Sequence, residues 1–293
     1  MEKIRVVGLM TVLTLLLVGL GGYVGGNGGA LMFFLIALAM NFGMYWFSDR
    51  IVLRQYRAHI VQPGDEGGRF DELYAMVDRL RQRAGLPMPV VAVSEQAQPN
   101  AFATGRNPEH AVVCVTRGMW ELVQRGGMTM EELEGVMAHE LAHVKHYHML
   151  VGTVAASMAG AIMMIARMMM FFGGGRDQDR NPLAMILLIV LAPLAAMLVR
   201  SAISQRNEYE ADAGGASISG NPLALASALR RIEAIAQRRP MEVNPAAAHL
   251  AIVNPLYGLG GLTSLFSTHP PTEERVARLQ QLAAAADPAR LAR

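Results

Sequence analysis

The sequence predicts a mainly α-helical integral membrane protein, with four transmembrane helices and a soluble α+β part that carries a small β-sheet. Hydrophobic residues make up 52% of the chain and charged residues only 17%, whereas soluble globular proteins carry about 25% charged residues. Four apolar runs are long enough to cross a bilayer, and they fall into two pairs. The stretches that follow each pair show helical and β-type periods of apolar residues.

Net charge and cysteine content narrow the classes of function. A formal net charge of +2 over 293 residues gives no strongly basic surface, so we expect no nucleic-acid partner. Cys114 is the only cysteine, which excludes an intramolecular disulfide. It lies in an apolar, strand-like run, where we expect a buried, unreactive thiol rather than a nucleophile.

Residues 1–50 are expected to form an N-terminal membrane hairpin. Residues 6–24 are an apolar run behind two basic residues, and residues 30–47 carry no charge, so each run can cross a bilayer once. No A-x-A cleavage site follows the first run and a second span comes almost at once, which favours an uncleaved anchor over a signal peptide. The glycine-rich residues 21–29 predict the connecting loop.

Residues 51–148 are expected to form the first part of a cytoplasmic domain. Arg50, Arg54 and Arg57 flank the second span, and the positive-inside rule places such a flank in the cytoplasm. Apolar residues at helical spacing then predict an amphipathic helix that ends at a Gly-Leu-Pro sequence. Two β-type runs are predicted in this part, at residues 89–93 and 111–115.

Between these two runs lies a short segment that includes Asn100, Ala101, Phe102 and Ala103. One interpretation is an ordinary hairpin strand. The other is an edge strand whose free backbone groups pair with an extended peptide substrate, a mode of recognition that requires little of the substrate's side chains. The sequence alone leaves both open.

An H-E-x-x-H motif lies in the helix that follows. Thr129 and Glu132 form a capping-box pattern at its start. His139 and His143 are four residues apart and share one helix face, so both imidazoles can bind a single zinc ion. Glu140 is offset by about 100° on the helix, which suits a general base that deprotonates a zinc-activated water.

Residues 149–200 are expected to form a second membrane hairpin. Its spans are predicted at residues 149–172 and 183–199, with a short polar turn between them. Basic residues follow the fourth span, so residues 201–293 return to the cytoplasm as the second part of the domain. Both termini are then cytoplasmic, and a last helix is predicted from residue 272 to about 286.

A catalytic zinc needs a third protein ligand. The metzincin pattern is excluded, because His146 stands where that pattern has glycine and Met149 where it has histidine. We interpret His146 and His148 as polar residues at the membrane boundary rather than as ligands.

Glu208 and Asp212 supply the expected remainder of the site. They are four residues apart after the fourth span, so Glu208 can bind zinc while Asp212 accepts a hydrogen bond from a ligand imidazole. His143 precedes the third span by about 9 Å of helix and Glu208 follows the fourth by about 13 Å. Both therefore lie near the same membrane face.

Taken together, these motifs resemble the HtpX family of membrane-bound zinc metalloproteases, which are related to the CAAX prenyl endopeptidases. The resemblance covers nearly the whole chain. It depends on the paired spans and on residues 100–105, 139–143, 208–212 and 267–275.

The resemblance implies a gluzincin-like zincin domain with one Zn²⁺ per chain, held by His139, His143 and Glu208, with Glu140 as general base. It also suggests His269 as the partner of the oxyanion, followed by Arg206, Tyr209 and His249 as alternatives.

The expected function is that of a zinc metalloendopeptidase in a bacterial inner membrane, with its active site facing the cytoplasm. The resemblance implies a stress-response role in quality control, with damaged or misfolded membrane proteins as substrates. A homo-oligomer or other membrane quality-control partners are left open. The alternatives are a prenyl-protein (CAAX-type) protease and a non-catalytic, zinc-stabilised membrane scaffold.

Overall fold

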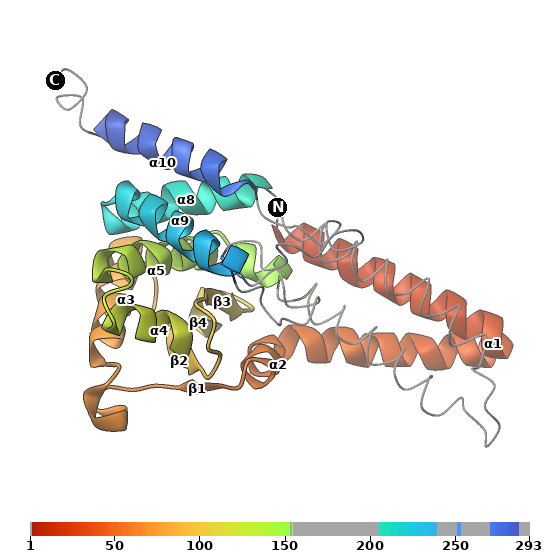
Figure 1. Ribbon diagram of the computed structural model, residues 1–293. Helices are drawn as coiled ribbons and strands as arrows, with labels where there is room; N and C mark the ends of the chain where they lie inside the picture. Colours follow the sequence, from red (N-terminus) through yellow and green to blue (C-terminus); the bar gives the residue numbers. More distant parts are fainter. Residues whose placement is uncertain (1, 153, 155–204, 239–250, 253–269, 287–293) are drawn as a thin grey trace.

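The computed structural model describes residues 2–152, 154, 205–238, 251–252 and 270–286. A long helical hairpin, α1, extends from a body of helices packed around a small sheet (Figure 1). The predicted third and fourth spans lie outside the described residues, apart from residues 148–152 and 154, where a helix begins. His249 and His269 also lie outside them.

The hairpin α1 (Glu2–Trp46) consists of two helices separated by a break at Gly25 and Gly26. Gly26 has φ +58° and ψ −146°, which only glycine adopts readily. The predicted loop over residues 21–29 is therefore wrong, because both helices continue up to this two-residue break. The outer glycines instead allow close contact: a Cβ atom on Gly21 would lie 2.5 Å from the carbonyl oxygen of Gly29.

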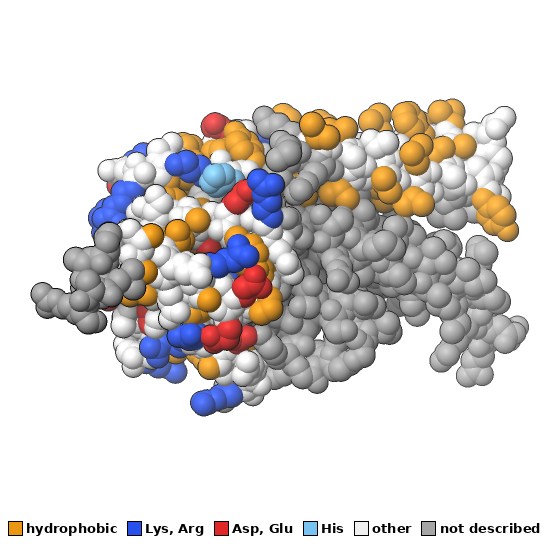
Figure 2. Space-filling view, turned by 90° about the horizontal axis from the view of Figure 1, so that it is seen from above, with side chains coloured by type: hydrophobic (Ala, Val, Ile, Leu, Met, Phe, Trp, Pro, Cys, Tyr) orange, Lys and Arg blue, Asp and Glu red, His pale blue; other side chains and the backbone are white. Residues whose placement is uncertain are grey.

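Two segments of the described chain are long and apolar enough to cross a membrane, Val6–Tyr23 and Gly25–Gly43. Their surfaces carry exposed hydrophobic side chains, whereas charged side chains gather on the body (Figure 2). Asn41 joins the two arms through a 2.9 Å hydrogen bond from its Nδ2 to the Oγ1 of Thr14.

Among the described residues, the sheet has four strands in the order β1-β2-β4-β3. Strands β2 and β4 are parallel, and the two outer pairs are antiparallel. The strands are β1 (Ala58–Ile60), β2 (Val90–Ser94), β3 (Ala101–Gly105) and β4 (Ala111–Thr116). Both predicted β-type runs are confirmed, and β3 lies at an edge of the sheet. The sequence did not predict β1, since three residues are too few for a β-type period to be recognised.

Seven further α-helices are described around the sheet and at its ends. They are α2 (Ser48–Gln55), α3 (Asp71–Ala84), α4 (Arg117–Gln124), α5 (Met130–Lys145), α8 (Gln205–Ser219), α9 (Pro222–Arg238) and α10 (Thr272–Ala286). The capping box of α5 is confirmed: the Glu132 amide donates to Thr129 Oγ1 at 3.1 Å, and the Thr129 amide donates to Glu132 Oε2 at 2.8 Å. The predicted last helix is confirmed as α10.

Helix α5 occupies the centre of the body, between the sheet and the helices α8 and α9 (Figure 1). Helix α5 can lie close to α8 because Gly215 has no side chain. A Cβ atom on Gly215 would lie 2.8 Å from the His139 backbone. One hydrophobic core includes Leu133 and Val136 of α5 together with Ala211 of α8 and Leu225 of α9. The part of the chain before residue 149 and the part after residue 204 therefore share one core.

The other face of the sheet packs against α2. Phe102 of β3 and Tyr56 bring their ring centroids to 4.5 Å, next to Cys114 of β4. Cys114 is fully buried, and burial raises the pKa of its thiol. The expectation of a buried thiol is confirmed, and the raised pKa disfavours a reactive thiolate.

Candidate metal centre

The three predicted metal ligands come together between α5 and α8. The Nε2 atoms of His139 and His143 are 3.1 Å apart. The Glu208 carboxylate lies opposite them, with Oε1 3.5 Å from the Nε2 of His143 and Oε2 3.8 Å from the Nε2 of His139. The helical period brings the two histidines to one face, and the close contact of the two helices brings the glutamate to them.

These separations fit a single divalent ion. Metal–ligand bonds of about 2.0–2.1 Å in tetrahedral geometry place two ligand atoms about 3.3 Å apart. The two imidazole nitrogens are 3.1 Å apart, and the carboxylate offers one oxygen 3.5 Å from the nitrogen of His143 and its other oxygen 3.8 Å from the nitrogen of His139. His139 and Glu208 are buried. The donor set of two imidazoles and one carboxylate is typical of catalytic zinc sites.

Asp212 lies beside the ring nitrogen of His139 that faces away from Glu208. Its Oδ1 lies 3.0 Å from the Nδ1 of His139, which leaves the Nε2 directed at the ligand group. Arg275 of α10 donates to both oxygens of Asp212, at 2.7 and 2.8 Å. Burial would raise the pKa of Asp212, but Arg275 and His139 outweigh this effect and hold the pKa well below its usual range.

Glu140 connects the ligand group to the edge strand. Its carboxylate accepts a hydrogen bond from the backbone amide of Ala103 in β3. Burial raises the pKa of Glu140 to about 7, although the neighbouring His139 opposes this shift. The side chain lies beside the three ligands without being one of them, as its offset on the helix predicts.

His148 contacts the second histidine ligand, which the sequence did not predict. Helix α5 ends at Lys145, and Tyr147 with φ +61° turns the chain so that His148 lies against His143. The two Nδ1 atoms are 3.2 Å apart. His148 is buried within the protein, which its interpretation as a polar residue at the membrane boundary did not predict.

The proton positions of this pair depend on whether an ion is bound to His143. When the Nε2 of His143 binds an ion, its Nδ1 carries the hydrogen and donates to the Nδ1 of His148. His148 must then be neutral, with its own hydrogen on Nε2. Burial, with a contribution from His146, lowers the pKa of His148 to about 4, which favours this neutral form.

Comparison with known proteins agrees with this geometry. Residues 68–283 match the model of peptidase family M48. The chain belongs to this family. As an M48 peptidase it is a metallopeptidase, and the resemblance inferred from its motifs is confirmed.

Relatives of this M48 peptidase match over nearly their whole length. It is 53% identical to the "Protease HtpX homolog" of Syntrophotalea carbinolica over 289 residues, which cover 96% of this chain and 99% of the relative. The homologue of Gemmatimonas aurantiaca is 52% identical, with 97% and 100% covered. Among solved structures, S. mikatae Ste24p aligns with a TM-score of 0.44 at 18% identity, covering 85% of this chain and 57% of that one.

Arg275 is a residue of the M48 centre that the sequence reasoning missed. Its side chain is 1% exposed, and it donates to the carbonyl of Ile252 at 2.9 Å as well as to Asp212. Its guanidinium also lies 3.6 Å from Glu208 Oε2. One signal was available: Arg275 lies on the helix face that Val276 and Leu279 bury, where an unpaired charge would be costly.

Asn100 does not belong to the free edge of β3. Its amide donates to Thr116 Oγ1 at 2.8 Å, and its carbonyl accepts from the Thr116 amide at 2.9 Å. Its side-chain oxygen accepts from the Ile252 amide at 3.0 Å. The prediction that the edge strand includes Asn100 is therefore wrong, because β3 begins one residue later, at Ala101. Residues Ala101–Gly105 form the edge strand.

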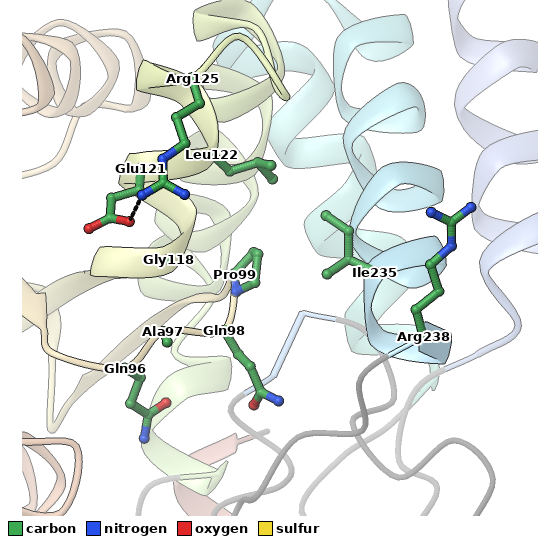
Figure 3. Close-up of a pocket in the computed structure, with 10 residues that line it drawn as sticks. All are labelled: Gln96, Ala97, Gln98, Pro99, Gly118, Glu121, Leu122, Arg125, Ile235 and Arg238. Carbon is green, nitrogen blue, oxygen red and sulfur yellow. Dashed lines mark hydrogen bonds and ion pairs between the residues drawn. The ribbon is translucent and has the colours of Figure 1, made fainter.

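A cavity of about 790 Å³ lies where the chain enters β3 (Figure 3). The loop from Gln96 to Pro99 forms one wall, and Leu122 of α4 and Ile235 of α9 lie opposite each other across it (Figure 3). Arg125 contributes a charge that is paired with Glu121 at 2.9 Å. None of the three metal-ligand candidates lines this cavity, so it is separate from the metal centre.

Proposed function

We propose that this M48 peptidase is a membrane-anchored zinc endopeptidase in which His139, His143 and Glu208 hold the ion and Glu140 is the general base. The observation that carries the proposal is a group of three ligand residues, two buried and one partly buried, whose ligand atoms lie within 4.8 Å of one another, with a carboxylate beside it. A structural zinc site has four protein ligands. In the described part of the chain this group has three, which favours catalysis over a zinc-stabilised scaffold.

The protein's own residues have distinct roles in this proposal. A bound zinc ion would lower the pKa of a coordinated water and polarise the scissile carbonyl. Glu140 accepts the proton and returns it to the leaving amine. Asp212 and His148 hold the rings of His139 and His143 in the tautomers that direct Nε2 inward. His269 is retained as the proposed partner of the oxyanion.

The substrate is proposed to be an extended segment of polypeptide. It would pair with backbone groups of Ala101, Phe102 and Ala103 at the edge of the sheet, apart from the Ala103 amide, which donates to Glu140. Support comes from the hydrogen bond between the Ala103 amide and the Glu140 carboxylate, since it brings the strand directly beside the base. Unfolded or damaged proteins expose many more extended segments than folded ones, so they are the proposed substrates.

The membrane attachment is proposed to place the centre at the cytoplasmic face of a bacterial inner membrane. The two apolar arms of α1 support an anchor, and Arg50, Arg54 and Arg57 support a cytoplasmic body. We retain residues 149–200 as a second hairpin between the two parts of the domain, residues 51–148 and 201–293.

The test is metal-dependent cleavage of an unfolded model protein by the full chain in detergent. A strong chelator should abolish cleavage, and one equivalent of zinc should restore it. Glu140→Gln should bind zinc like the wild type and lose cleavage at least about 100-fold, since general acid–base catalysis contributes about 10²–10⁴-fold. Glu134→Gln, in the same helix but paired with Arg83 outside the centre, is the control and should cleave normally. Wild-type cleavage rates in Glu140→Gln would refute the proposal.

A further inference from the structure

A second group of candidate ligands adjoins the first. His146, His148 and Glu210 each offer one ligand atom, and these atoms lie within 4.8 Å of one another. His146 follows the last residue of α5, and Glu210 lies on α8. The rings of His146 and His148 are stacked, with centroids 5.4 Å apart and planes inclined by 22°.

The geometry of this group is compatible with a single divalent ion. The Nε2 of His148 is 3.5 Å from Glu210 Oε2, close to the separation of about 3.3 Å between two ligands of a tetrahedral ion. The His146 ring lies over α8, since a Cβ atom on Gly214 would be 3.9 Å from its Nε2. Because His146 is exposed, its side chain can move to bring its ligand atom closer to those of His148 and Glu210.

Local charge makes this group a weaker site than the first. Arg206 donates to Glu210 Oε1 at 2.9 Å, which leaves Oε2 for an ion but places a positive charge beside it. His146 is exposed and Glu210 is only partly buried, whereas His139 and Glu208 are buried. Water therefore competes more strongly for an ion here than in the first group.

The two groups are linked by one hydrogen atom. When an ion occupies the first group, the Nδ1–H of His143 donates to the Nδ1 of His148, whose own hydrogen is then on Nε2. An ion on the Nε2 of His148 moves that hydrogen to Nδ1. Two N–H groups would then face each other across 3.2 Å, and His143 would lose its hydrogen-bond acceptor.

We propose that His146, His148 and Glu210 form a second site for a divalent transition-metal ion, and that an ion bound there opposes the ion in the first site. The proposal extends the proposed function, because it assumes that His143 binds zinc through Nε2. Its consequence is a peptidase that one equivalent of zinc activates and that excess zinc inhibits.

The test uses the full chain in detergent, with zinc as the probe. Bound zinc is counted by equilibrium dialysis, and cleavage of an unfolded model protein is followed over the same titration. The wild type should bind a second zinc at least about tenfold more weakly than the first and lose activity as it binds. His146→Ala should keep the first zinc and full activity at one equivalent, but lose both the second zinc and the inhibition.

Two further variants sharpen the result. Arg206→Gln should strengthen the second site and lower the zinc concentration that inhibits. His110→Ala removes an exposed histidine far from this group along the chain and should behave like the wild type.

A wild type that binds one zinc only, or a His146→Ala variant that binds two, would overturn the second site. If excess zinc inhibited His146→Ala as strongly as the wild type, the proposal that the second ion opposes the first would be overturned. If the protein cleaved nothing at any zinc concentration, the proposed function would fail, while the zinc counts would still decide whether the second site exists.

Discussion

Asp212 Oδ1 lies 3.0 Å from the Nδ1 of His139, and this contact sets which ring nitrogen faces Glu208. Glu208 and Asp212 of α8 therefore lie on different sides of the same imidazole. Glu208 lies on the Nε2 side, where an ion would bind, and Asp212 lies on the Nδ1 side. Substitutions of these two residues should differ in kind.

Glu208→Ala should be nearly free of zinc at low zinc concentration, because it removes one of three ligands and a negative charge. Asp212→Asn should bind zinc with affinity reduced by roughly 10–100-fold, the usual effect of removing such an orienting partner. Its activity should partly recover as zinc is raised. Zinc content and cleavage rate across a titration provide the measurement. If Asp212→Asn were free of metal while Glu208→Ala kept its zinc, Asp212 would be the ligand and Glu208 the orienting partner.

Arg275→Met should destabilise the body strongly, because Asp212 would remain buried without its guanidinium partner. Breaking a buried pair in this way typically costs about 3–5 kcal/mol. Arg230→Met is the matched control, since Arg230 forms an exposed 2.9 Å ion pair with Glu273 and such pairs contribute about 0–1 kcal/mol. Thermal unfolding followed by circular dichroism compares them. Equal midpoints for the two variants would contradict a structural role for the buried pair.

Gly215→Ala should weaken zinc binding although Gly215 touches no ion. Its new Cβ atom would meet the His139 backbone at 2.8 Å, so α8 must move away from α5 and carry Glu208 with it. Zinc affinity, measured by competition with a chelator, should fall. Ala213→Ser, at an exposed position of the same helix, should leave it unchanged. An unaltered affinity in Gly215→Ala would mean that the ligand group does not depend on this close approach.

Peptides methylated on single backbone nitrogens should reveal pairing with β3. Methylation removes one amide donor, and each lost hydrogen bond of about 0.5–1.5 kcal/mol should lower kcat/KM roughly 2- to 10-fold. The effect is expected at alternate residues near the cleaved bond, because alternate residues of a strand direct their backbone groups to the same neighbour. Methylation far along the peptide is the control. Uniform cleavage of all the methylated peptides would rule out recognition by the edge strand.

Reporter fusions should locate both parts of the domain on the cytoplasmic side. A fusion after Arg57 and one after Arg206 should each give a cytoplasmic signal, because the positive-inside rule predicts that the basic flanks of the proposed spans face that side. A periplasmic signal from either fusion would separate His139 and His143 from Glu208. It would therefore contradict both the topology and the proposed ligand group.

The sequence predicted those parts of the centre that depend on the period of a single helix. His139 with His143, and Glu208 with Asp212, are each four residues apart, so each pair is fixed by its own helix. The same holds for the capping box at Thr129 and for the start of α10. Local patterns of this kind are complete within a few residues of sequence.

Residues that depend on tertiary contacts were not predictable in this way. Arg275 reaches Asp212 only because α10 lies over α8, and nothing near Arg275 in the sequence specifies that packing. His148 required a left-handed residue at Tyr147, which no sequence rule favours there. The glycines at 21 and 29 suggested a loop, since their need for close helix contact is visible only in three dimensions.

The two ligand helices, α5 and α8, are separated in the chain by the residues proposed to form the second hairpin. During synthesis, the ribosome completes His139 and His143 well before Glu208. A growing chain therefore has two thirds of its ligand group and no complete centre until the intervening segment has been translated. The order of the sequence thus delays proteolytic activity until both parts of the domain have been synthesised.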